Sequence, residues 1–182
     1  VDEAAGRDLL VSAQTGSGKT VAYGLAVAPT LLGEEDRFGR AGAPLALVIA
    51  PTRELAMQVK TELAWLYAET GARIATCVGG MDSRAEQKML AAGAHIVVGT
   101  PGRIMDHLGR GNLNLEAMNT LVLDEADRML DMGFFDDIVT VAKQCPKERQ
   151  TLLFSATYPD GIAKISKQFM KEPQTITVQA QH

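Results

Sequence analysis

Short apolar runs alternate along the chain with segments in which apolar residues recur every three or four positions. The continuously apolar run 45–50 is typical of a parallel strand buried on both faces, whereas 53–70 carries a helical stripe of leucine and valine. The predicted strands are 9–11, 45–50, 73–78, 95–99, 120–123, 151–154 and 175–178. The predicted helices are 21–32, 53–70, 82–92, 101–108, 136–144 and 160–170. This alternation predicts an α/β fold in three layers, a parallel sheet with helices on both faces and right-handed crossovers.

Glycine, proline and capping residues separate these elements. Gly33 is predicted to end the first helix, and Asp82 is placed to cap the third. The polar, glycine-rich stretch 33–44 is interpreted as a solvent-exposed surface insertion, with a partner-binding site as the alternative.

The composition of the 182 residues is that of one globular domain, with 46% hydrophobic and 22% charged residues. No apolar run approaches the length of a membrane span, and the start of the chain has no signal-peptide pattern. Cys77 and Cys145 lie far apart without metal-ligand spacing, which favours thiols in a reducing cytoplasm. The sequence therefore predicts a cytoplasmic protein without a membrane partner.

The charge balance limits how this chain can bind nucleic acid. A net charge of −4 and a pI near 5.4 argue against binding by overall charge. Any nucleic-acid site must instead be local, built from placed backbone amides and a few arginines such as Arg53 and Arg103.

A glycine-rich stretch lies between the first predicted strand and the first predicted helix. It reads Ala13-Gln14-Thr15-Gly16-Ser17-Gly18-Lys19-Thr20. The spacing is that of the phosphate-binding loop G-x-x-x-x-G-K-[ST], with alanine in the first position. Gly16 and Gly18 permit a tight turn whose backbone N–H groups face nucleotide phosphates, and the helix N-terminus adds partial positive charge. We expect Lys19 to contact the β- and γ-phosphates and the Thr20 hydroxyl to coordinate Mg²⁺; an ordinary turn before a helix is the alternative.

Two acidic residues directly follow the predicted strand 120–123. A buried strand would hold both carboxylates rigidly at the edge of the sheet. We expect Asp124 to hold Mg²⁺ opposite Thr20, and Glu125 to orient and help deprotonate the attacking water. The alternative is a pair of acids that cap the helix that follows.

Six motif segments each follow a predicted strand, and sites in parallel sheets lie at the carboxyl ends of the strands. Asp124 to Asp127 spell DEAD, and over nearly its whole length the chain resembles the first RecA-like domain of DEAD-box RNA helicases of bacterial type, which are P-loop NTPases. The matching segments are 13–20 (motif I), 51–56 (motif Ia), 79–80 (the GG motif), 100–103 (motif Ib), 124–127 (motif II) and 155–157 (motif III).

The resemblance implies that the chain binds RNA through its sugar-phosphate backbone, independently of base sequence. The residues implicated are Pro51, Thr52, Arg53, Gly79, Gly80, Thr100, Gly102 and Arg103. Backbone N–H groups at helix starts and arginine side chains bind phosphates without reading bases. Contact with 2′-hydroxyls would favour RNA over DNA. For 100–103, plain helix initiation is the alternative, because Pro101 suits a first turn.

The resemblance further implies that Asp127, Ser155 and Thr157 couple the ATP state to RNA grip and domain closure. From the residues alone, Ser155 and Thr157 are equally well interpreted as cap or turn hydroxyls. Residues 1–182 contain neither the family's adenine-recognising Q motif nor its second RecA-like domain, which supplies arginines that stabilise the transition state. We therefore expect the chain alone to hydrolyse ATP barely or not at all.

The resulting interpretation is the ATP- and RNA-binding half of an ATP-dependent RNA helicase, which couples ATP hydrolysis to local unwinding of RNA duplexes. A catalytically inert, nucleotide-dependent binding module is the main alternative. A DNA translocase is a second alternative, against which the combined DEAD, TPGR and SAT segments argue.

Overall fold

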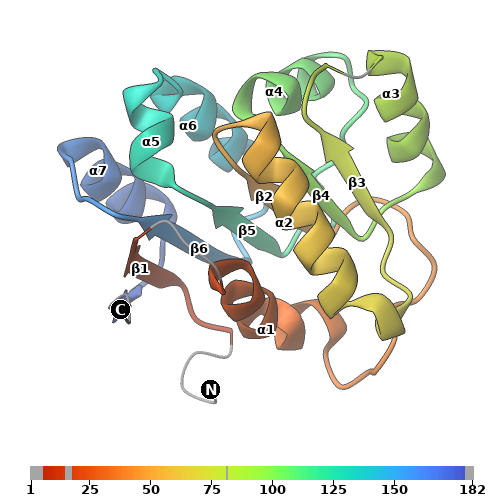
Figure 1. The fold of residues 1–182 in the computed structure, drawn as a ribbon, viewed down its shortest axis with the longest axis horizontal. Coiled ribbons are helices and arrows are strands. Elements are labelled where there is room, and N and C mark those ends of the chain that lie inside the picture. Colours follow the sequence, from red (N-terminus) through yellow and green to blue (C-terminus); the bar gives the residue numbers. More distant parts are fainter. Residues whose placement is uncertain (1–5, 15–17, 81, 179–182) are drawn as a thin grey trace.

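A seven-stranded parallel sheet forms the centre of the molecule, in the order β3-β4-β2-β5-β6-β1-β7 (Figure 1). The computed structural model describes residues 6–14, 18–80 and 82–178. The strands are β1 (Leu9–Ala13), β2 (Ala46–Ile49), β3 (Ile74–Cys77), β4 (Ile96–Gly99), β5 (Thr120–Leu123), β6 (Gln150–Ser155) and β7 (Gln174–Val178). The helices are α1 (Lys19–Leu32), α2 (Arg53–Leu66), the 3₁₀ helix η2 (Ala68–Thr70), α3 (Ser83–Ala92), α4 (Pro101–Gly109), α5 (Ala126–Asp131), α6 (Phe135–Gln144) and α7 (Asp160–Phe169). The predicted three-layer α/β fold is confirmed.

Two apolar cores lie on the two faces of the sheet, because successive strand residues point to opposite sides. In β2, Ala46 and Val48 face one core, and Leu47 and Ile49 face the other. The first core is covered by α1 and α2, which cross the front of the sheet in Figure 1. The second core takes buried residues from α3, α4, α5, α6 and α7. The central strands are therefore buried on both faces, which explains the continuously apolar sequence of β2.

Local signals set several of the helix ends. The Thr52 side chain accepts a hydrogen bond from the N–H of Leu55 at the start of α2, and Asp82 caps α3 by accepting from the N–H of Arg84. Gly33 ends α1 with a positive φ of 62°, a conformation that glycine adopts at little cost. The predictions for Gly33 and Asp82 are thus confirmed.

The predicted helix 53–70 is wrong at its end. The helix stops at Leu66, and the chain turns at Tyr67 into η2. Tyr67 is buried, and its hydroxyl donates a hydrogen bond to the carbonyl of Gly24 in α1. A tertiary contact, which helical spacing does not encode, therefore fixes where this helix ends.

Two further features differ from the expectation or add to it. The short helix α5 directly follows the acidic pair at 124–125 and lies outside the predicted helical ranges. The loop 33–44 is exposed over most of its length, as predicted, but the Phe38 ring anchors it by stacking on His95 with ring centroids 4.5 Å apart. The Phe38 N–H also donates to the carbonyl of Thr70. Across the described ranges, no helix combines the length and apolarity needed to cross a bilayer.

Candidate nucleotide and RNA site

The candidate residues form two groups along one edge of the sheet. Every strand pair is parallel, so the carboxyl ends of all the strands lie on the same edge. The segments after β1, β5 and β6 make up the first group, and those after β2, β3 and β4 make up the second. The strand order places these groups on adjacent halves of the sheet.

Within the phosphate-loop candidate 13–20, Gly18 is the N-cap of α1. Gly18 has a left-handed φ of 92°, and within the described residues no side chain caps the helix, so its first N–H groups are available to a ligand there. Lys19 then projects from the first turn, and its Nζ lies 2.7 Å from Oδ1 of Asp124. Thr15, Gly16 and Ser17 lie outside the described residues, so the structure does not test their predicted roles. Ala13 lines the neighbouring cavity, and Gln14 is exposed.

Asp124 is completely buried at the end of β5. Burial raises the pKa of its carboxyl, while the nearby ammonium of Lys19 acts in the opposite direction. The Tyr23 hydroxyl donates to Oδ2 of Asp124 at 3.3 Å, and the buried Thr20 side chain is close enough to influence the same hydroxyl. Burial, with the charge of Asp124 as the next contribution, raises the pKa of Tyr23 well above its usual value.

Tyr23 is a site residue that the sequence analysis missed. It stands four residues after Lys19 and three after Thr20 on α1, a spacing that places all three on one helix face. That spacing was the available signal. Through Tyr23, the structure brings the predicted Mg²⁺ ligands Thr20 and Asp124 to one polar cluster.

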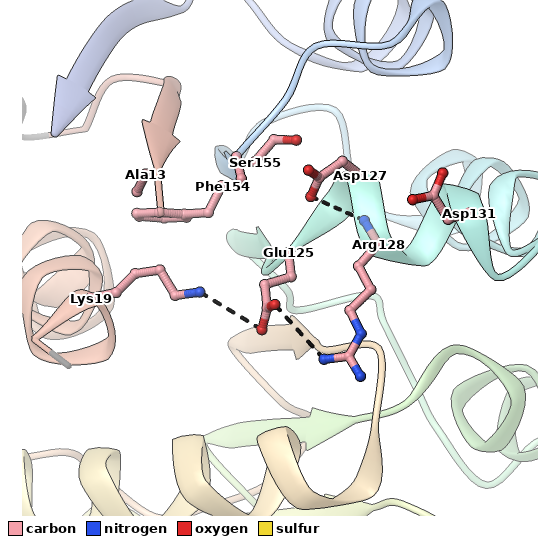
Figure 2. A pocket seen from close by; sticks show the side chains of 9 residues that line it. Ala13, Lys19, Glu125, Asp127, Arg128, Asp131, Phe154 and Ser155 are labelled. Carbon is pink, nitrogen blue, oxygen red and sulfur yellow. Dashed lines mark hydrogen bonds and ion pairs between the residues drawn. The ribbon is translucent and has the colours of Figure 1, made fainter. Parts of the chain in front are cut away.

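Glu125 has an unusual backbone conformation, with φ 50° and ψ 53°. A left-handed conformation is uncommon for a residue other than glycine and marks local strain. Its carboxylate lies 4.0 Å from Lys19 Nζ and 3.9 Å from Arg128 Nη1 (Figure 2). Because Arg128 is half exposed, its ion pair with Glu125 is weak. The turn after β5 therefore aims Glu125 toward Lys19.

A cavity of about 210 Å³ lies beside these residues. It is lined by Ala13, Lys19, Glu125, Asp127, Arg128, Asp131, Phe154, Ser155 and Ala156. Figure 2 shows Lys19 and Arg128 approaching Glu125 from opposite sides. The cavity thus joins the phosphate-loop candidate, the acidic segment and the segment after β6.

The residues present fit a divalent cation that takes most of its ligands from phosphate and water. Oδ1 of Asp124 is buried, and its partner within the described residues is the Lys19 ammonium, a cation at 2.7 Å. Thr20 is buried nearby. Over the same residues, no group of three or more His, Cys, Asp or Glu side chains forms a metal cage of its own. One carboxylate, one hydroxyl and substrate phosphates are the set that Mg²⁺ commonly uses.

The predicted coupling residues are in direct contact. Thr157 donates to Oδ2 of Asp127 from its N–H at 3.0 Å and from its hydroxyl at 2.9 Å. The Ser155 hydroxyl donates to the carbonyl of Thr157. The segment after β6 is therefore fastened to the segment after β5.

In the second group, both candidate arginines lie against the glycine pair. The guanidinium of Arg53 packs directly on Gly80, and Arg103 Nη2 lies 3.5 Å from the point that a side chain on Gly79 would occupy. Both glycines have positive φ, 73° for Gly79 and 68° for Gly80. A side chain at either position would be strained, and one on Gly80 would also crowd the Arg53 guanidinium.

The starts of α2 and α4 differ in a way that bears on anion binding. Thr52 caps α2 with its own hydroxyl, whereas Thr100 makes no side-chain cap at α4 and Pro101 has no N–H to cap. The N–H groups of Gly102 and Arg103 consequently have no intrahelical acceptor. A Cβ on Gly102 would meet open space, so this helix start is accessible. Pro51, by contrast, is buried.

The described fold and site define a P-loop NTPase domain of the RecA-like type, with a phosphate-loop lysine after β1 and its acidic partner after β5. The chain belongs to the DEAD/DEAH box helicase family, whose family model matches residues 1–165.

Known relatives agree with this assignment. ATP-dependent RNA helicase CshA of Listeria monocytogenes is 49% identical over 175 residues, covering 96% of this chain and 32% of that protein. ATP-dependent RNA helicase DeaD of Haemophilus influenzae is 50% identical, covering 95% and 27%. The crystal structure of a DEAD box protein from the hyperthermophile Methanococcus jannaschii matches with a TM-score of 0.84 and 39% identity, covering 95% of this chain and 46% of that one. This chain thus spans about a third of the length of the two bacterial relatives.

Proposed function

We propose that the chain is the ATP- and RNA-binding part of an ATP-dependent RNA helicase. The observation that carries this proposal is the 2.7 Å contact between Lys19 Nζ and Asp124 Oδ1 beside a cavity that also contains Glu125. A lysine and a buried carboxylate held this close are suited to bind a nucleoside triphosphate and its cation. The names of the relatives favour this function over an inert binding module.

In this proposal, the segment 13–20 cradles the phosphates of ATP. Lys19 leaves Asp124 to contact the β- and γ-phosphates, while Thr20 and Asp124 would hold Mg²⁺. When bound, Mg²⁺ would neutralise charge on the phosphate oxygens. Tyr23 keeps the Asp124 carboxylate oriented through its hydrogen bond to Oδ2.

Glu125 is proposed to act on the water that attacks the γ-phosphate. Its carboxylate is largely buried but lines the cavity, so it can accept a hydrogen bond from that water and take up its proton. The left-handed turn holds the carboxylate in position before substrate arrives, which lowers the cost of orienting it during the reaction.

RNA is proposed to lie along the second group of residues. The free N–H groups of Gly102 and Arg103 and the guanidinium groups of Arg53 and Arg103 suit phosphate oxygens. Because these groups would contact phosphates and not the edges of the bases, binding would be independent of the RNA sequence. Thr52, Gly79, Gly80 and Thr100 shape this surface, and the buried Pro51 would act through the backbone alone.

The contact between Asp127 and Thr157 is proposed to couple the ATP state to RNA binding, together with a second RecA-like domain in the full-length protein. Arginines from that domain would complete the hydrolytic site, so residues 1–182 alone would hydrolyse ATP barely or not at all. Both cysteines are free and buried, which suits the cytoplasm that we propose as its location.

Binding of a fluorescent ATP analogue with Mg²⁺ tests the nucleotide site. We expect saturable binding to the chain that Lys19→Ala abolishes. Lys143→Ala, which removes an exposed lysine on α6, is the matched control and should bind like the wild type. Equal binding by Lys19→Ala and the control would overturn the proposed site.

A further inference from the structure

A buried carboxylate joins the glycine pair to helix α4. Glu86 lies on α3 and is completely buried. Its Oε2 accepts from the N–H of Val78 at 2.8 Å, and its Oε1 accepts from Arg103 Nη1 at 3.0 Å and from His107 Nε2 at 2.9 Å. None of these contacts involves the nucleotide cavity.

The three partners explain why a carboxylate is tolerated at this depth, since a buried charge is costly unless it is paired and hydrogen-bonded. They also define what the carboxylate connects. Val78 directly precedes Gly79 and Gly80, whereas Arg103 and His107 are on successive turns of α4. Glu86 therefore sets the distance between the glycine pair and the start of α4.

His107 is itself held in a defined state. Asn112 Nδ2 lies 3.1 Å from His107 Nδ1 and donates to it, which leaves the ring proton on Nε2, facing Glu86. The histidine ring is completely buried. His107 is thus a fixed donor that orients the Glu86 carboxylate.

Glu86 binds only one of the three guanidinium nitrogens of Arg103. Nη1 is bound to the carboxylate, and Nη2 lies over Gly79. Within the described ranges, Nε and Nη2 have no hydrogen-bond acceptor, and the side chain keeps 21% of its surface exposed. A guanidinium is planar and rigid, so fixing one of its nitrogens fixes the direction of the remaining donors.

We propose that Glu86 and His107 are positioning residues for RNA binding, which hold the Arg103 guanidinium against Gly79 so that its remaining donors meet an RNA phosphate. This inference rests on the proposed RNA-binding role of Arg103. It assigns to a buried cluster, behind the RNA surface, control over one phosphate contact.

Binding of fluorescent single-stranded RNA to the full-length protein, with a non-hydrolysable ATP analogue and across a range of KCl concentrations, tests the inference. Arg103→Ala should weaken binding and reduce the salt slope by about 0.7, the contribution of one phosphate on a single strand. Glu86→Gln should weaken binding about tenfold, as expected for one impaired charge-assisted hydrogen bond. In the Arg103→Ala background, Glu86→Gln should have no further effect.

A second pair of variants covers the case in which Glu86→Gln fails to fold. His107→Gln retains an N–H donor toward Glu86 and should bind RNA like the wild type, whereas His107→Phe should lose affinity and salt slope. Gln87→Ala, at an exposed neighbour on α3, is the matched control. Affinity for the ATP analogue should stay unchanged in all these variants.

The outcomes separate the inference from the proposal beneath it. If Arg103→Ala binds RNA with the wild-type affinity and slope, the RNA role of Arg103 is wrong and the inference with it. If Arg103→Ala is impaired but Glu86→Gln and His107→Phe are not, only the positioning inference is overturned. A loss from Glu86→Gln that is equally large in the Arg103→Ala background would likewise overturn it, because that loss would be merely structural.

Discussion

Thr157 donates both its backbone N–H and its hydroxyl to a single oxygen of Asp127. Thr157→Val removes only the hydroxyl and keeps the shape and the N–H bond. We expect ATP hydrolysis by the full-length protein to remain within about twofold of wild type, while the number of RNA duplexes unwound per ATP falls several-fold, because one neutral or charge-assisted bond is worth about 1 to 3 kcal/mol. Parallel ATPase and unwinding assays measure this ratio. Thr140→Val on α6 is the control, and an unchanged ratio in Thr157→Val would contradict the coupling role.

Lys19→Ala should lower stability as well as abolish nucleotide binding. It leaves the buried Asp124 carboxylate without its ion-pair partner, a change that typically costs about 3 to 5 kcal/mol. The double variant Lys19→Ala with Asp124→Asn removes the uncompensated charge and should recover most of this loss, but not nucleotide binding. Urea unfolding of the three proteins gives the comparison. No recovery in the double variant would show that the ion pair does not account for the loss.

The raised pKa of Asp124 predicts a particular pH dependence. A carboxyl whose pKa is higher in the folded than in the unfolded state stabilises the fold at low pH, and this contribution is lost as pH rises through the folded pKa. Asp124→Asn should therefore gain stability relative to wild type between pH 4 and pH 7.5, while losing nucleotide binding. Unfolding measurements at both pH values check the sign. A relative loss of stability in Asp124→Asn at the higher pH would mean that Lys19 outweighs burial.

Substitutions at Glu125 can distinguish the effect of its left-handed backbone conformation on stability from the role of its carboxylate in ATP hydrolysis. Glu125→Gly relieves the strain but loosens the unfolded chain, so its stability should stay within about 1 kcal/mol of wild type. Glu125→Val places a β-branched residue at positive φ and should cost about 1 to 2 kcal/mol more. Both variants should lose ATP hydrolysis, as should Glu125→Gln. Thermal unfolding of these variants and ATPase assays in the full-length protein together test this, and hydrolysis surviving in Glu125→Gln would remove Glu125 from the reaction.

Gly80→Ala should impair RNA binding without affecting nucleotide binding. The new methyl group would collide with the Arg53 guanidinium. The backbone at position 80 also has a φ of 68°, which is unfavourable for alanine. We expect a loss of about 1 to 2 kcal/mol in stability and a weaker RNA affinity with a smaller salt slope. Gly39→Ala, in open space and without positive φ, is the control. RNA titrations that show the same affinity for both variants would contradict a role for Arg53.

The sequence predicts the fold well where patterns are long and repeated. Strands β2 and β4 carry no polar side chain, because helices bury both of their faces. Helix α5, six residues long, is too short to show a period, and the end of α2 depends on the contact between Tyr67 and Gly24. Tertiary contacts of this kind leave no local signal.

The candidate site is predicted unevenly for a related reason. Motif spacing placed Lys19 and Asp124 on one edge of the sheet, and their contact follows from the parallel topology. Glu86 escaped notice because its partners Arg103 and His107 stand 17 and 21 residues away, on another helix. Residues that act from behind a surface carry no motif of their own.

The position of β6 has a mechanical consequence. Leu152 pairs with Leu9 on one side and with Val122 on the other, so one strand is hydrogen-bonded to both strands that carry the nucleotide motifs. The distance between the segment after β1 and the segment after β5 is therefore set by the width of the single strand β6 between them. A nucleotide bound there would therefore not spread these strands apart, and we expect its effect to pass through the turns that follow β1 and β5.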